Sequence, residues 1–200
     1  MFVKRILDLF IAAVLMLIVA LLWLLIVIWI RLDSPGPAIF RQIRIGRGGK
    51  PFTIYKFRTM VQNADEVMRQ RLEKLKAEGE FDPDNFIFQE KDDPRVTPSG
   101  RFLRRTSLDE LPQLLNILNG TMSVVGPRPE VPEIVSEYTP EQRGRLEMLP
   151  GVTGLAQVSG RSDLTLSQTL EYDLEYVRGW RLGLDFRILV RTVRVVFSGR

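Results

Sequence analysis

The sequence of 200 residues contains neither cysteine nor histidine. Without cysteine it can form no disulfide, no thiolate nucleophile and no zinc–sulfur site. Without histidine, few side chains other than carboxylates are available for nucleophilic or acid–base chemistry. Any bound metal ion must be held by oxygen ligands, which favours Mg²⁺ over zinc. The glycine-rich phosphate-binding patterns GxxxxGK[ST] and GxGxxG are also absent.

Charged residues are missing from one long segment, residues 9–30, which reads LFIAAVLMLIVALLWLLIVIWI. As a helix, these residues would extend about 33 Å, enough to cross the hydrocarbon core of a bilayer. The segment is too long for the apolar part of a signal peptide, and no small-residue cleavage site follows it. The sequence therefore predicts a membrane-embedded helix over residues 1–32 and a cytosol-facing domain over residues 33–200.

The charges that flank this segment bear on its orientation. Lys4 and Arg5 precede it, and Arg31 and Arg41 follow it. Because basic residues mark the cytoplasmic side, these flanks favour a re-entrant helix with both ends in the cytoplasm. The middle of the segment, LIVALLWLL, contains no proline or glycine to break the helix, which favours a straight span. The residues alone leave both topologies open.

Lysine is scarce, with 6 residues against 22 arginines, and the formal net charge is +4. The arginine fork binds phosphate and carboxylate in a bidentate manner. This composition suits anionic lipid headgroups, nucleotide phosphates or nucleic acid, and a bias in codon usage would also explain it. No known nucleic-acid recognition motif is present, so we expect no nucleic-acid partner.

The region after residue 33 predicts an α+β fold dominated by helices. Residues 38–46 alternate in period two and turn through glycines into residues 51–60, which predicts a short β-hairpin. Residues 184–197 predict an amphipathic helix, with apolar Phe186, Leu189 and Val193 on one side. Its other side carries Arg187, Arg191 and Arg194. Such a helix suits a membrane interface, or packs its apolar side on the domain core.

Two carboxylates, Asp109 and Glu110, stand side by side in TSLDELPQLLNILNG, residues 106–120. Ser107 and Glu110 fit a capping box, which predicts a helix from this point to Gly120. Its expected buried residues are Leu111, Leu114, Leu115 and Leu118. A helix N-terminus favours ionised carboxylates and attracts phosphate. A capping role alone would explain the pair if it stood in isolation.

Cations around this pair favour chemistry instead. Upstream lie Arg101, Arg104 and Arg105, and Arg128 follows between two prolines in VVGPRPE. A Pro-Arg-Pro segment holds its guanidinium with little conformational freedom, which suits an oxyanion but also a structural turn. An aspartate beside Mg²⁺ and arginines can act as a nucleophile toward phosphorus.

Two further segments could add to such a site. Lys56 and Arg58 alternate with aromatic residues in YKFRTM, which predicts two cations on one face of a strand. PGVTGLAQVSGR, residues 150–161, is rich in glycine and predicts a loop, either one that contacts a nucleotide or a plain connection.

Four stretches of the sequence together resemble the bacterial sugar transferase family, also called monotopic phosphoglycosyl transferases. They are KRILDLFIA, DSPGPAIFRQIRIGRGGKPFTIYKFRTM, DDPRVTPSGRFLRRTSLDELPQLLNILNGTMSVVGPRPE, and PGVTGLAQVSGR followed by EYDLEYV. The resemblance covers nearly the whole chain. It implies transfer of a sugar 1-phosphate from a UDP-sugar to polyprenyl (undecaprenyl) phosphate with release of UMP, the first step of lipid-linked surface-glycan assembly. The alternative is a non-catalytic, membrane-anchored scaffold of a glycan-assembly complex.

The resemblance also implies roles for particular residues. Asp109 would be the nucleophile that forms a covalent phosphosugar intermediate, with Glu110 as its partner and Mg²⁺ bridging Asp109 and the diphosphate. The implied substrate- and phosphate-binding residues are Lys56, Arg58, Arg104, Arg128, Gln157, Arg161 and Asp173.

The resemblance places the protein in the bacterial inner membrane, in contact with its lipids and with the active site on the cytoplasmic face. Family members commonly break the membrane helix with proline where this chain has Ala20-Leu21. We still expect a re-entrant helix, because both flanks are basic and the site must share the cytoplasm with the UDP-sugar. The sequence leaves a homo-oligomer open.

Overall fold

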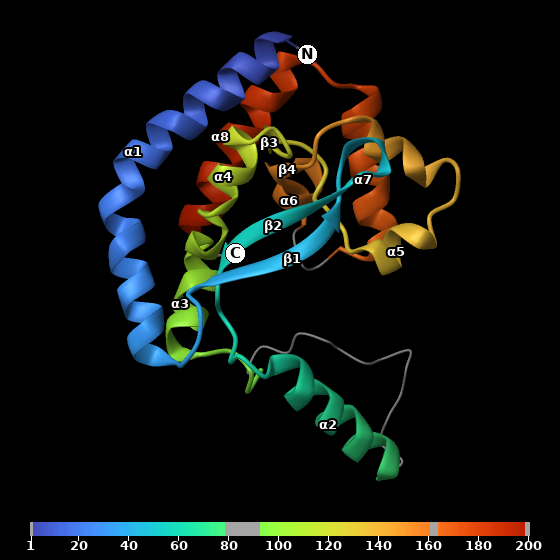
Figure 1. Cartoon of the computed structure of the whole chain (residues 1–200). Helices are drawn as coiled ribbons and strands as arrows, with labels where there is room; N and C mark the ends of the chain where they lie inside the picture. The colour runs from blue at the N-terminus through green and yellow to red at the C-terminus, as the bar shows by residue number, and fades with distance from the viewer. Residues whose placement is uncertain (1, 79–92, 161–163, 199–200) are drawn as a thin grey trace.

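The structure, a computed structural model, describes residues 2–78, 93–160 and 164–198. Its first element is α1 (Phe2–Asp33), a single helix that curves along one side of the molecule (Figure 1). In the described part of the chain, only α1 is long and apolar enough to cross a membrane. The side chains of Leu17, Ile18 and Leu21 in its middle are 69–80% exposed. The helix continues without a break through Ala20-Leu21.

The N-terminal end of α1 is bound to the folded domain by buried charged groups. Lys4 Nζ donates hydrogen bonds to Asp185 Oδ2 at 2.8 Å and to the carbonyl oxygen of Val125 at 3.0 Å. Asp8 Oδ1 accepts a hydrogen bond from the backbone N–H of Val124 at 3.1 Å. Lys4 and Asp8 are only 6% and 4% exposed, so one face of this end of α1 packs against the domain, while Phe2 and Ile6 on its other side are exposed.

The C-terminal end of α1 is bound to the same domain. Asp33 Oδ2 accepts hydrogen bonds from the hydroxyl and the backbone N–H of Ser99, at 2.7 and 3.1 Å. Ile30 is fully buried in a cluster with Phe57 and Leu103. The exposed apolar middle of the helix therefore lies between two ends that share one domain.

The predicted hairpin is confirmed. Strands β1 (Ile39–Ile45) and β2 (Pro51–Phe57) pair antiparallel, in a register that runs from Ile39 opposite Phe57 to Ile45 opposite Pro51. The short helix η1 (Arg47–Gly49) connects them, with Gly48 and Gly49 in the left-handed conformation that favours glycine. Alternate residues of β2, Phe52 and Ile54 among them, are buried in the core.

The fold is α+β and helix-dominated, as predicted. A second, two-stranded parallel sheet joins β3 (Ser123–Val125) and β4 (Gly151–Thr153). The helices α2, which projects from the rest of the molecule, and α3 to α8 complete the structure (Figure 1). Their bounds are α2 Ala64–Ala77, α3 Pro98–Thr106, η2 Leu108–Glu110, α4 Gln113–Leu118, α5 Pro132–Ser136, η3 Gln142–Glu147, α6 Leu155–Ser159, α7 Leu166–Arg178 and α8 Leu182–Ser198.

The glycine-rich segment after Pro150 forms β4 and α6, so the prediction of a loop there was wrong. Its glycines allow two backbones to pass close together. A Cβ atom on Gly151 would lie 2.1 Å from the backbone nitrogen of Gly126, and one on Gly126 would lie 2.4 Å from the carbonyl oxygen of Leu149. Only glycine fits both positions, since real Cβ contacts are never this short.

The C-terminal helix α8 packs on the core, but of the apolar face predicted for it only Leu189 contacts the core, so the alternative that this whole face packs there was wrong. Asp185 and Ile188 are buried, whereas Phe186 and Val193 are 70% and 57% exposed. Asp185 turns inward because it accepts hydrogen bonds from Lys4 and from the hydroxyl of Tyr176. This buried polar anchor sets the rotation of the helix, which the periodicity of its apolar residues did not reveal.

Candidate active site

Asp109 and Glu110 lie in the single turn η2 between α3 and α4. The chain turns sharply at Ser107, which ends α3 in the left-handed conformation with φ of 56°. The Ser107 side chain makes no capping hydrogen bond, and α4 begins only at Gln113, so the predicted capping box does not form. The carboxylates therefore lie on a tight turn before the helix rather than within its first turn.

The side of α4 that is buried also differs from the prediction. Leu114 is 6% exposed as expected, but Leu115 and Leu118 are 41% and 39% exposed, and Ile117 is buried instead. The fully buried Asn116 explains this rotation, because its side chain is hydrogen-bonded to the backbone of β2 at Thr53 and Tyr55. These bonds dock α4 and the preceding turn against the strand that carries Lys56.

Two cations meet on one oxygen of Glu110. Lys56 Nζ from β2 and Arg128 Nη1 from the Pro-Arg-Pro segment each lie 3.1 Å from Glu110 Oε1. The Glu110 and Lys56 side chains are 18% and 17% exposed, and that of Arg128 is 41% exposed. Three segments far apart in the sequence thus form one ion-paired cluster that is partly open to solvent.

The Asp109 carboxylate makes no hydrogen bond or ion pair with the described residues, yet several charges lie near it. Burial and the neighbouring Glu110 raise the pKa of Asp109 to about 6, against the opposing effect of Lys56, Arg104 and Arg128. The cations lower the pKa of Glu110 to about 2 although burial opposes them. Glu110 is therefore a permanent anion, and Asp109 is an unpaired carboxylate that ionises near neutrality.

Arg104 approaches the pair from α3. Its Nε donates a hydrogen bond to Thr59 Oγ1 at 3.0 Å, which fixes the guanidinium at the end of β2. The pKa of Arg104 is lowered, because burial outweighs the opposing effect of the negative charges of Asp109 and Asp93. The sequence-predicted residues Asp109, Glu110, Lys56, Arg104 and Arg128 are thus brought together in the structure.

Arg58 does not join this cluster. Its guanidinium donates hydrogen bonds to the carbonyl oxygens of Ser34 and Pro35, at 2.6 and 2.8 Å, and to Ser34 Oγ at 2.8 Å. The residue lies one position beyond the end of β2 and is only 6% exposed. It binds the chain where α1 ends, so the prediction that it shares a face with Lys56 was wrong.

The three remaining predicted residues differ in their placement. Gln157 lies on α6, where its Nε2 atom contacts the carbonyl oxygen of Val152 at 3.5 Å. Arg161 lies outside the described residues. Asp173 is fully buried in an ion pair with Arg145. Sequence reasoning missed Arg145, because nothing in QRGRLE distinguishes it from the neighbouring surface arginine.

The donor set fits Mg²⁺ only in one way. The described residues contain no group of three acidic side chains that could hold a metal ion. Mg²⁺ is commonly bound by one or two carboxylates together with substrate phosphates. Asp109, which has no partner among the described residues, suits that mode, whereas Oε1 of Glu110 already contacts Lys56 and Arg128.

A carboxylate without a partner among the described residues, with three cations near it, has the charges that suit a phosphate-bearing ligand. The family model for bacterial sugar transferases matches residues 1–199 of this chain. The chain therefore belongs to the bacterial sugar transferase family.

Several relatives are similar over nearly the whole chain. It is 44% identical over 199 residues to undecaprenyl-phosphate galactose phosphotransferase of Salmonella typhimurium, covering 98% of this chain and 40% of the relative. It is 44% identical over 198 residues to UDP-glucose:undecaprenyl-phosphate glucose-1-phosphate transferase of Caulobacter vibrioides, covering 95% and 68%. An uncharacterized sugar transferase, EpsL of Bacillus subtilis, is 40% identical over 196 residues, covering 98% and 88%. The chain thus spans about two-fifths of the length of the first of these relatives and a larger share of the other two.

Proposed function

We propose that this protein transfers a sugar 1-phosphate from a UDP-sugar to a polyprenyl phosphate and releases UMP. The observation that carries the proposal is the unpaired Asp109 carboxylate beside Lys56, Arg104 and Arg128. The relatives named for this reaction with glucose and galactose support it. A diphosphate brings negative charge to a carboxylate, and the three cations offset the repulsion.

The reaction proceeds in two displacements. An Asp109 carboxylate oxygen attacks the sugar-linked phosphorus of the UDP-sugar, and the bond from that phosphorus to the bridging oxygen breaks, which releases UMP. A phosphate oxygen of the polyprenyl phosphate then attacks the same phosphorus. The bond to Asp109 breaks, and the free carboxylate is regenerated.

Lys56 and Arg128 bind the phosphate oxygens, and Glu110 holds both cations in place. With its pKa near 2, Glu110 stays ionised and is unsuited to proton transfer at neutral pH. Mg²⁺, held by Asp109 and the diphosphate, would neutralise charge on the transferred phosphate and on the leaving UMP. The Asp109 pKa near 6 leaves most of this carboxylate ionised at pH 7.

We further propose that α1 is embedded in the cytoplasmic leaflet of the inner membrane with both ends on the cytoplasmic side. The buried contacts of Lys4 and Asp8 at one end and of Asp33 at the other support this topology. A straight span would carry one end across the bilayer and break one set of contacts. Tags at both termini should be protected from external protease in intact cells, and exposure of the N-terminal tag alone would refute the topology.

The reaction is tested with purified protein, Mg²⁺ and a panel of UDP-sugars, beginning with UDP-glucose and UDP-galactose, with luminescent detection of UMP. A covalent intermediate predicts about one equivalent of UMP per protein without polyprenyl phosphate, and continuous release once it is added. Chelation of Mg²⁺ should abolish both. A non-catalytic scaffold would release no UMP from any UDP-sugar.

A further inference from the structure

A second arginine–carboxylate pair lies behind the active-site cluster. Arg145 on η3 and Asp173 on α7 form an ion pair whose side chains are 2% and 1% exposed. Arg145 also donates a hydrogen bond to the hydroxyl of the buried Tyr138. The transfer reaction described above makes no use of either charge.

The pair is connected to the active site through the backbone of Arg128. Arg145 Nη2, the same atom that contacts Asp173, donates a hydrogen bond to the carbonyl oxygen of Arg128 at 2.6 Å. The guanidinium of Arg128 in turn contacts Glu110 at 3.1 Å. A continuous chain of contacts therefore runs from Asp173 through Arg145 and Arg128 to Glu110.

The backbone around Arg128 is held at every carbonyl. Four consecutive carbonyl oxygens accept hydrogen bonds from other segments: Pro127 from the N–H of Gly151, Arg128 from Arg145, Pro129 from Arg44, and Glu130 from the N–H of Ile45. Pro127 and Pro129 have no N–H of their own and a fixed φ. Of these four hydrogen bonds, the one from Arg145 comes from a fully buried side chain. Because the same Nη2 atom also contacts Asp173, the direction of this hydrogen bond depends on Asp173.

Neither member of the pair is placed to touch a substrate. Both are closed to solvent, whereas the Arg128 side chain at the end of the same chain of contacts is 41% exposed. Truncation of Arg145 would leave the Arg128 carbonyl without that donor. The loop 127–130 would then lose the hydrogen bond closest to the Arg128 guanidinium, which contacts Glu110.

We propose that Arg145, oriented by Asp173, is a positioning residue that sets the Arg128 guanidinium against Glu110. The role of Asp173 is then to orient Arg145 rather than to bind the UDP-sugar directly. The kinetic consequence rests on the transfer reaction proposed above, whereas the placement of the loop does not.

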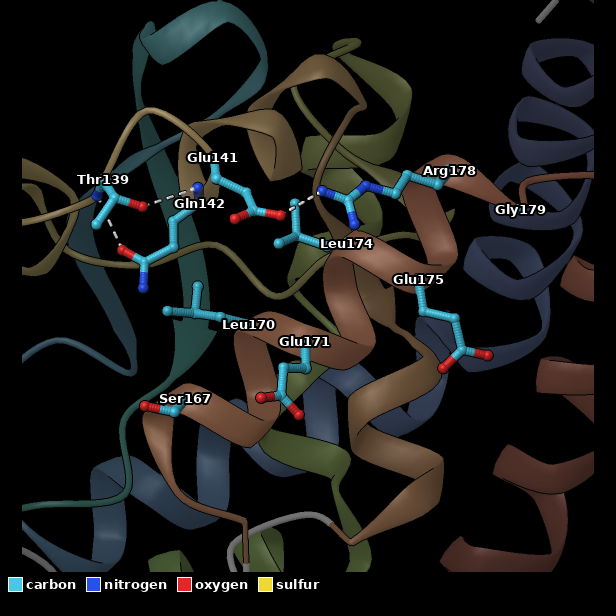
Figure 2. A pocket seen from close by; sticks show the side chains of 10 residues that line it. All are labelled: Thr139, Glu141, Gln142, Ser167, Leu170, Glu171, Leu174, Glu175, Arg178 and Gly179. Atoms are coloured by element: carbon cyan, nitrogen blue, oxygen red, sulfur yellow. Dashed lines mark hydrogen bonds and ion pairs between the residues drawn. The ribbon is translucent and has the colours of Figure 1, made fainter.

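The same two segments supply a matched control. Arg178 at the end of α7 pairs with Glu141 just before η3 at 2.7 Å, with both side chains about two-thirds exposed. Figure 2 shows this pair at the pocket between the two segments, which is lined by residues of α7 and by Thr139, Glu141 and Gln142. Arg178→Ala therefore removes an ion pair between the same elements without altering the support of the loop.

The first measurement is hydrogen–deuterium exchange of peptides that contain the amides of Gly126, Arg128 and Glu130. Arg145→Met and Asp173→Asn should increase exchange there, and Arg178→Ala should not. Asp173→Asn keeps the size of the side chain and an oxygen acceptor, so it tests the proposal if Arg145→Met fails to fold. Unchanged exchange in a folded Arg145 or Asp173 variant would overturn the proposal.

The second measurement is a double-mutant cycle on kcat for UMP release. Arg145→Met should lower kcat about 10- to 100-fold in the wild-type background, with partial recovery in Arg145→Lys. In an Arg128→Met background the same change should have almost no further effect. Effects that multiply instead would show that Arg145 does not act through Arg128. If the wild-type protein releases no UMP, the proposed function fails and the exchange result still decides the loop support.

Discussion

Glu110 and Asp173 are both carboxylates paired with arginine, and both are linked to residue 128, but one lies at the open edge of the domain and the other inside it. Glu110 contacts two cations and has a pKa of about 2. Burial raises the pKa of Asp173 to about 6, against the opposing effect of its arginine. Direct contact with two cations outweighs burial at Glu110, whereas burial outweighs the contact with Arg145 at Asp173. The outer cluster, Asp109 and Glu110 with Lys56 and Arg128, thus keeps a fixed negative charge at Glu110, and we have proposed that it binds substrate. The inner pair, Arg145 and Asp173, contacts the backbone of Arg128 instead.

The largest effect is expected at the outer cluster. Asp109→Asn should lower UMP formation by about 10⁴-fold or more, because the amide is not a nucleophile toward phosphorus. The same substitution should not destabilise the folded protein. The pKa of Asp109 is higher in the folded than in the unfolded protein, so its ionisation costs stability as pH rises from 3.8 through about 6.

Thermal melting at pH 7.5 should therefore give the Asp109→Asn variant a midpoint equal to or above that of the wild type. A variant that retained activity would refute the role of Asp109, and one that melted much earlier would show that Asp109 is structural.

The ion pair of Arg145 and Asp173 should contribute more to the free energy of unfolding than the contacts of Glu110 with Lys56 and Arg128. Arg145→Met leaves the buried Asp173 without its cation and should destabilise the protein by about 3 kcal/mol. Glu110→Gln leaves Lys56 and Arg128 partly solvated and should cost about 1 kcal/mol. Denaturant unfolding of both variants in the same detergent compares the two. If Glu110→Gln destabilised the protein more than Arg145→Met, the assignment of the inner pair to structure and of the outer cluster to function would be wrong.

Acid should affect the two carboxylates of the outer cluster at different pH values. Because Asp109 must be ionised to attack, the single-turnover rate of UMP formation should fall as the pH is lowered through the pKa of Asp109, which is about 6 without metal and lower where the carboxylate holds Mg²⁺. Glu110 has the lower pKa of the two without metal and adds no second step near pH 6. Rapid-quench measurements on the acid side of pH 8 check this, and a rate that rises as the pH falls would contradict an ionised nucleophile.

The smallest effect is expected at the exposed ion pair. Arg178→Ala should change the free energy of unfolding by less than about 0.5 kcal/mol and leave kcat unaltered, because both partners are largely solvated. A larger loss, measured by the same unfolding and UMP assays, would mean that the pocket in Figure 2 contributes more to the fold than its exposure indicates.

The sequence predicted those parts of the fold that depend on local pattern. The apolar run became α1, and the alternating residues around Gly48 and Gly49 became the hairpin. The meeting of Lys56, Glu110 and Arg128 was also predicted, although from the resemblance and from the charge pattern rather than from geometry. Local periodicity identifies elements and their amphipathic sides well when apolar packing alone decides their orientation.

The failures occurred where buried polar groups decided the orientation instead. Asn116 rotates α4 through bonds to β2, Asp185 rotates α8 through Lys4, and Arg58 turns from the strand to the end of α1. Each partner lies at least 20 residues away along the chain, so no local pattern carries the information. Arg145 was missed for the same reason, because its importance comes from a carbonyl 17 positions earlier.

The contact between Lys4 and Asp185, 181 positions apart, has a consequence for the order of synthesis. The ribosome completes α1 long before it completes α8, so during synthesis Lys4 and Asp8 lack their partners in the domain and their charges favour water or lipid headgroups. Only after Asp185 emerges can the first turn of α1 close onto the domain. The first turn of α1, although made before the rest of this domain, is thus among the last of its parts to reach its final place.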